Sequence, residues 1–257
     1  MQLKRFAAVV RLNLLLQLRN PTITLLMTVI PLVMIPFMEP AFKSMLLADG
    51  YTEATGVEQA VPSMAVLFAF LAVQTVIQSF FHERTWGTWP RLEMSATSSG
   101  TLLMGKALVA YLIQSLQAVA VIVLGMTLFG FRPAGGVGAL LVVVLAFSAV
   151  LAALGVAIAL VTPSEEVGLS LSNVIGMLAA GVGGSFCTVS NFPDWAQSIA
   201  RFSPAYWALN ASHAVSLDGA SVADILPQLG MLAVFLVAIV FVVVIRCLTK
   251  KGDSTRG

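Results

Sequence analysis

The feature that most constrains this chain is a series of six long apolar segments that contain very few charged residues. They cover residues 22–42, 59–81, 105–131, 137–161, 168–187 and 225–247. The hydrocarbon core of a bilayer is about 30 Å thick and requires roughly 20 apolar residues of helix, so each segment is long enough to cross it. We therefore predict an all-α, polytopic membrane protein with six transmembrane helices in one domain.

The composition supports this class of protein and argues against others. Hydrophobic residues make up 58% of the 257 residues and charged residues only 10%, whereas soluble domains carry about 25% charged residues. A net charge of +2 is too small to indicate a nucleic-acid partner. The two cysteines form no metal-binding or disulfide pattern. We therefore expect no metal and no cofactor in this chain, and membrane lipids as its surroundings.

The positions of the Lys and Arg residues predict the orientation. Only Lys43, Arg132 and Arg201 fall on one side of the six predicted spans, whereas the other 11 of the 14 basic residues fall on the opposite side. Cytoplasmic segments carry the excess of Lys and Arg in membrane proteins. This asymmetry predicts that both termini are cytoplasmic.

Three segments of the chain lie outside the predicted spans. Residues 2–19 place apolar side chains at helical spacing, which is typical of a helix lying in the membrane interface; the alternative is an extension of the first span. Residues 82–104 form a cytoplasmic loop. Residues 188–224 are amphipathic and rich in aromatic residues, and we expect short helices at the outer face, before the last span.

The segment Gly100 to Ala107 nearly matches the phosphate-binding pattern G-x-x-x-x-G-K-[ST]. Ala107 lacks the hydroxyl that would bind magnesium, no strand precedes the segment, and a predicted membrane helix follows it. His82 and His213 fall on opposite sides of the membrane. We therefore expect that this chain is not an enzyme and has neither a nucleotide site nor a catalytic site.

The cytoplasmic loop carries candidate contacts to a soluble partner. A pore protein without its own energy source requires a surface on which a motor can act. Charged side chains offer such contacts, and a glycine permits close backbone approach. The alternative is that the arginines only fix orientation and bind lipid headgroups. On these grounds the candidate docking residues are Glu83, Arg84, Gly87 and Arg91.

This loop resembles that of type-2 ATP-binding-cassette (ABC) transporter permeases. In that family an acidic and a basic residue precede Gly-Thr, a short coupling helix ends in Leu, and Gly-Lys opens the third span. Residues 83, 84, 87, 88, 92, 105 and 106 match that pattern, although Ala96 stands where a proline is common. The resemblance implies that Thr88 and Leu92 also belong to the docking residues. Residues 192–207, with Pro193, Trp195 and Pro204, are similar to the family's segment between spans five and six.

The resemblance implies the membrane subunit of an exporter in the bacterial cytoplasmic membrane. A second permease copy or homologue would complete a dimer, and a separate ABC-type ATPase subunit would bind ATP and magnesium. The substrate would be hydrophobic or amphipathic, such as a drug, antibiotic or peptide. The alternatives are export of a lipid-linked glycan or lipid, or a non-transporting assembly or signalling partner. An ion-coupled carrier is disfavoured because Glu39, the only acidic residue near a span, lies at an outer edge.

Polar residues within the predicted spans suggest a second candidate site. Gln74 and Gln78 share one face of the second span, and Asn173 lies within the fifth. Buried amides in hydrocarbon require hydrogen-bond partners. They either bond neighbouring helices to one another or line a substrate path, and the sequence leaves both interpretations open.

Overall fold

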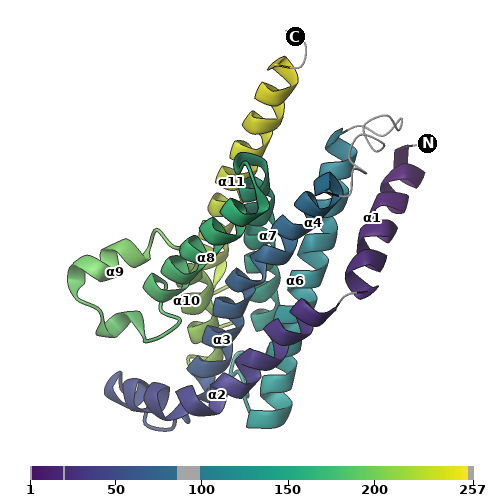
Figure 1. The fold of residues 1–257 in the computed structure, drawn as a ribbon. Helices are drawn as coiled ribbons and strands as arrows, with labels where there is room; N and C mark the ends of the chain where they lie inside the picture. Colours follow the sequence, from purple (N-terminus) through teal and green to yellow (C-terminus); the bar gives the residue numbers. More distant parts are fainter. Residues whose placement is uncertain (1, 20, 86–98, 254–257) are drawn as a thin grey trace.

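The computed structural model describes residues 2–19, 21–85 and 99–253, and every regular element in that part of the chain is a helix (Figure 1). The all-α prediction is therefore confirmed. The elements are α1 (Gln2–Arg19), α2 (Thr22–Ala48), α3 (Val57–Leu71), α4 (Val73–Thr85), α6 (Ser99–Phe129), α7 (Val137–Val161), α8 (Glu165–Val182), η1 (Val189–Asn191), α9 (Asp194–Ala200), α10 (Pro204–Ser216) and α11 (Leu226–Asp253).

From α2 onward the long helical stretches alternate in direction, with α3 and α4 running the same way (Figure 1). Figure 1 shows the start of α1, the end of α4, the start of α6 and the end of α11 at one end of the molecule. The end of α2 and the end of α6 lie at the other. This arrangement places the end of α4 and the start of α6, which flank the predicted cytoplasmic loop, at the same end of the bundle as the start of α1 and the end of α11.

Five helical stretches of the described residues are long and apolar enough to cross a membrane. They are α2, residues Val57–Phe81 of α3 and α4, most of α6, the whole of α7, and most of α11. The protein is thus a multi-pass membrane protein. The fifth predicted span corresponds to α8, which begins with Glu165 and Glu166 and is not among the five. Its crossing remains a prediction, with which the alternating helix directions are consistent.

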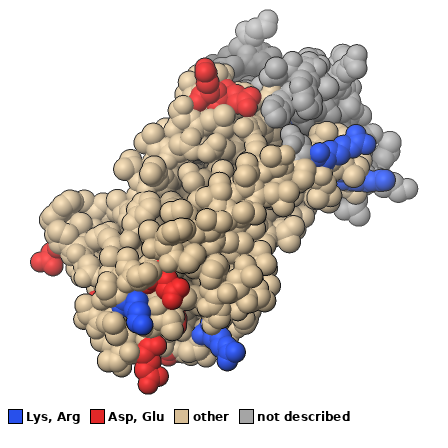
Figure 2. All heavy atoms as spheres, turned by 60° about the horizontal axis from the view of Figure 1, so that its bottom comes forward, with Lys and Arg blue, Asp and Glu red and all other residues tan. Residues whose placement is uncertain are grey.

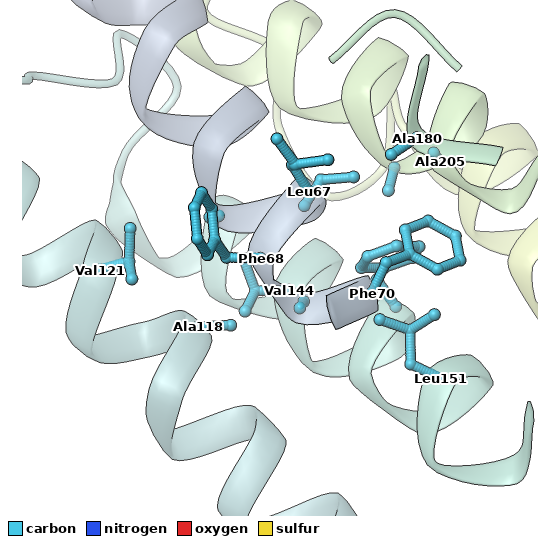
Figure 3. Close-up of a cluster of buried hydrophobic side chains, with 14 of the residues drawn as sticks. Leu67, Phe68, Phe70, Ala118, Val121, Val144, Leu151, Ala180 and Ala205 are labelled. Carbon is cyan, nitrogen blue, oxygen red and sulfur yellow. The ribbon is translucent and has the colours of Figure 1, made fainter. Parts of the chain in front are cut away.

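Helix α3 lies at the centre of the bundle and is almost completely buried. Figure 3 shows Phe68 and Phe70 of α3 among side chains of α6, α7 and α8. The Phe70 ring meets Phe147 edge-on, with the ring centres 5.4 Å apart. By contrast, α2 and α11 leave most of their apolar side chains exposed within this single chain.

Small residues allow the central helices to approach one another closely, as the glycines and alanines of the fourth and fifth predicted spans indicate. A Cβ atom on Gly155 of α7 would lie 2.8 Å from the Cβ of Val76 in α4. A Cβ on Gly176 of α8 would lie 3.2 Å from the Cβ of Phe70. Such close packing is the main attraction between helices in lipid, where burial away from water no longer drives association.

Two glutamines of α6 satisfy carbonyl groups that neighbouring helices leave free. Pro31 has no N–H, so the Met27 carbonyl one turn earlier in α2 lacks its usual donor. The Gln117 side chain donates to this carbonyl at 3.0 Å. The predicted span 59–81 is broken at Ala72, and Gln114 donates at 3.1 Å to the carbonyl of Ala69, in the last turn of α3.

The segment between α8 and α11 contains the short helices η1, α9 and α10, in keeping with the sequence prediction for residues 188–224. Ser203 caps α10 by accepting a hydrogen bond from the Ala205 N–H, and Trp207 Nε1 donates to the Arg201 carbonyl at 2.9 Å. Helix α1 packs closely on α6 at Gly105. A Cβ atom on this glycine would lie 2.7 Å from a methyl group of Val9. The interfacial placement of α1 remains a prediction.

Candidate functional site

The predicted docking residues lie at or beyond the end of α4. Glu83 and Arg84 belong to its last turn, at the same end of the bundle as the start of α6, but their side chains are outside the described part of the structure. Gly87, Thr88, Arg91 and Leu92 are outside the described residues altogether. Their role in docking therefore remains a prediction.

A buried lysine ties together the two helices that flank this loop. Lys106 is only 3% exposed, and its Nζ donates to the Ser79 carbonyl of α4 at 2.6 Å. The same ammonium group lies 4.7 Å from the centre of the Phe80 ring, within the range of a cation–π interaction. The ends of α4 and α6 are thus held in one position relative to each other at the base of the loop.

The second candidate set is partly brought together. Gln74 Nε2 of α4 donates to Asn173 Oδ1 of α8 at 2.5 Å, and Gln78 lies one turn further along α4, half-buried. Asn173 is exposed. This bond joins two helices, as the interpretation of these amides as interhelical hydrogen-bonding groups predicts. The other interpretation, a substrate path along these residues, stays a prediction.

The distribution of charge agrees with a membrane-embedded belt. Figure 2 shows the described Lys, Arg, Asp and Glu side chains near the two ends of the visible face, with a broad uncharged region between them. Charged groups inside the hydrocarbon layer are costly, so this uncharged region is the part of the surface suited to contact lipid tails.

A polar cavity that was not predicted from the sequence lies at the end of the bundle opposite the end of α4. It has a volume of about 520 Å³ and lies between the segment after α2, the start of α3, the end of α8, η1 and α10. Tyr206, Asn210 and His213 reach it from one face of α10. Their spacing of four and three residues was a detectable signal, because it places polar groups on one side of a helix.

Two comparisons bear on the family of this chain. A family model described as ABC-2 type transporter matches residues 4–217, from α1 to the residue after α10. The chain is also similar to the linearmycin resistance permease protein LnrN of Bacillus subtilis (strain 168), with 27% identity over 198 residues. That alignment covers 76% of this chain and 51% of the relative, so the chain spans about half the length of the relative.

Proposed function

Because this chain belongs to the ABC-2 type transporter family, we propose that it is the membrane subunit of an exporter driven by a separate ABC-type ATPase subunit. The exporter moves a hydrophobic or amphipathic compound out across the cytoplasmic membrane of a bacterium, with both termini of this chain in the cytoplasm. The observation that carries the proposal is the family match over residues 4–217, which includes both helices that flank the loop.

The packing around α4 supports a route for mechanical coupling. In this proposal the ATPase subunit binds ATP and magnesium and contacts residues 83–92. Helix α4 contacts α6 through Lys106, contacts α7 where Val76 meets Gly155, and contacts α8 through the Gln74–Asn173 bond. Displacement of the end of α4 would therefore reach three neighbouring helices directly.

The exposed helices support a dimeric assembly. The outward faces of α2 and α11 are apolar, with Val33, Phe37, Val237 and Phe241 all more than half exposed. Lipid tails or a second permease subunit can cover such surfaces. In the proposed transporter a second copy or homologue packs against part of this area, and lipids cover the rest.

The name of the relative suggests a substrate class. LnrN is named for resistance to linearmycin, and we extend this to the present chain as export of an amphipathic antibiotic. The test is to express the chain with its ATPase partner in a linearmycin-sensitive bacterium. A matched strain carries the same ATPase with its phosphate-binding lysine replaced by alanine.

The proposal predicts higher linearmycin tolerance and lower cell-associated linearmycin only with the intact ATPase. A panel of other amphipathic antibiotics tests whether the substrate differs from that of the relative. If neither tolerance nor accumulation of any compound depends on the intact ATPase, the exporter assignment is wrong.

A further inference from the structure

The polar cavity opposite the loop has the size of a small-molecule site. Its volume of about 520 Å³ lies within the range of roughly 300–1,000 Å³ that is usual for ligand pockets. Amide side chains of Gln59, Gln197 and Asn210 line it. Gln59 and Gln197 each donate one hydrogen bond within the chain and Asn210 accepts one, and the remaining donor and acceptor positions of these amides can bond to hydroxyl groups. The cavity is therefore suited to a compact ligand with many hydrogen-bonding groups.

The formal charge of the cavity lining is negative. Among the described residues that line it, Asp49 and Asp218 are the only acidic ones, and none is a lysine or an arginine. Asp49 accepts a hydrogen bond from Ser190 Oγ, and Asp218 accepts one from Tyr51 Oη, both at 2.8 Å. Hydroxyl donors orient these carboxylates without cancelling their charge.

The histidine in the cavity does not supply the missing positive charge. Burial lowers the pKa of His213, and the charges of Asp218 and Asp49 offset this only in part. Its ring lies 5.4 Å from the Tyr51 ring, and its Nε2 is buried without a hydrogen-bond partner among the described residues.

No Lys or Arg side chain is among the described residues that line the cavity. Arg132 lines a separate hollow together with Glu53 and Glu58, on another side of Tyr51. Burial is the largest cause that raises the pKa of Tyr51 to about 12, followed by the hydrogen bond to Asp218 and the charges of Asp218 and Asp49. The charged groups that act on Tyr51 are thus carboxylates. The field within the cavity thus favours a cation.

We propose that this cavity binds a protonated amine carried on a hydroxyl-rich molecule. The ammonium group pairs with Asp49 and Asp218, and the hydroxyl groups bond to the amide side chains. The described residues contain no group of three His, Cys, Asp or Glu able to hold a metal ion, which favours an organic cation. In the proposed exporter this ligand is the polar end of the exported compound, and only that link rests on the proposed function.

Three matched probes test the site with the purified full chain in lipid nanodiscs, without any ATPase. N-methyl-D-glucamine, D-sorbitol and D-gluconate share a hydroxylated carbon chain and end in a cationic, a neutral and an anionic group. Saturation-transfer NMR titrations at pH 7.5 measure their binding. We expect saturable binding of the amine, at least tenfold weaker binding of sorbitol, and no saturable binding of gluconate.

Variants then locate the site. Asp49→Asn and Asp218→Asn should each weaken amine binding about tenfold and leave sorbitol binding nearly unchanged. Glu53→Gln is the matched control, because it removes a carboxylate from the neighbouring hollow, and amine binding should persist. Thermal unfolding checks that each variant is folded.

Equal binding of the three probes, no binding of the amine, or folded Asp49→Asn and Asp218→Asn variants that keep the amine preference would each overturn the site. If the variants do not fold, the probe comparison on the unmodified chain still decides. ATP-dependent export without amine preference rejects the cavity alone. Amine binding without any ATP-dependent export rejects the exporter alone.

Discussion

The contact between Gln117 and the Met27 carbonyl allows a quantitative test of how α2 accommodates its prolines. Gln117 is 4% exposed, and its amide is the donor that replaces the N–H that Pro31 lacks. Replacing Gln117 with Leu removes that donor and leaves the carbonyl unsatisfied. In a Pro31→Ala background, the backbone N–H that the substitution introduces can restore the bond within α2, so the glutamine becomes redundant.

The expected cost follows from the hydrogen bond. Interhelical hydrogen bonds in membrane proteins contribute about 0.6 kcal/mol on average and at most about 1.7, and a buried carbonyl left without a donor costs about 1–3 kcal/mol. We therefore expect Gln117→Leu to lower the free energy of unfolding by about 1.5 kcal/mol in the unmodified chain. In the Pro31→Ala background the same change should cost less than about 0.5 kcal/mol.

Equilibrium unfolding of the four proteins in mixed detergent micelles measures this difference. Gln114→Leu is the matched control, because its acceptor is the Ala69 carbonyl at the end of α3 rather than one freed by a proline. Its cost should be the same with and without Pro31. An equal cost of Gln117→Leu in both backgrounds would refute the explanation of the contact.

Three further predictions concern the packing and the cavity. Gly155→Leu should destabilise the fold by about 1–3 kcal/mol in the same unfolding assay, because its Cβ would lie 2.8 Å from the Cβ of Val76; a small effect would mean that α4 and α7 can separate. Alanine substitutions of Gln74 and Asn173 should be non-additive by about 0.6 kcal/mol, and strict additivity would count against their bond. Burial lowers the native pKa of His213 below its ordinary 6.5, so the unfolded state binds more protons below that pH, and stability should fall as the pH drops through about 6.5. His213→Gln should flatten that dependence, measured by unfolding at each pH.

The sequence was sufficient to predict the class of fold because the signal is local and strong. Long apolar segments must become helices in lipid, and the alternating directions of α6 and α7 follow from the short connection between them. The break at Ala72 was not predictable in this way. No glycine or proline marks it, and the donor that satisfies the Ala69 carbonyl is Gln114, 45 residues away.

The candidate sites show the same division. Glutamines within the spans indicated hydrogen bonds between helices, but only the packing could identify the acceptor of Gln117 or pair Gln74 with Asn173. The polar face of α10 was a detectable part of the cavity, but its carboxylates were not, because their contacts join distant positions. Asp49 pairs with Ser190, and Asp218 with Tyr51, across separations of 141 and 167 residues. Such contacts depend on how the helices pack and leave no local pattern.

The central claim, that a separate ATPase drives this permease through the loop after α4, is most directly tested by a triple variant. Glu83→Ala, Arg84→Ala and Arg91→Ala together should abolish copurification with the ATPase or its substrate-stimulated turnover in lipid, while membrane insertion persists. Truncating one partner of a desolvated charge pair costs about 2–5 kcal/mol, whereas an exposed pair contributes about 0–1. Glu53→Ala, which removes a charge at the opposite end of the bundle, should copurify and turn over normally. A triple variant that binds the ATPase and turns over like the unmodified chain would contradict the account.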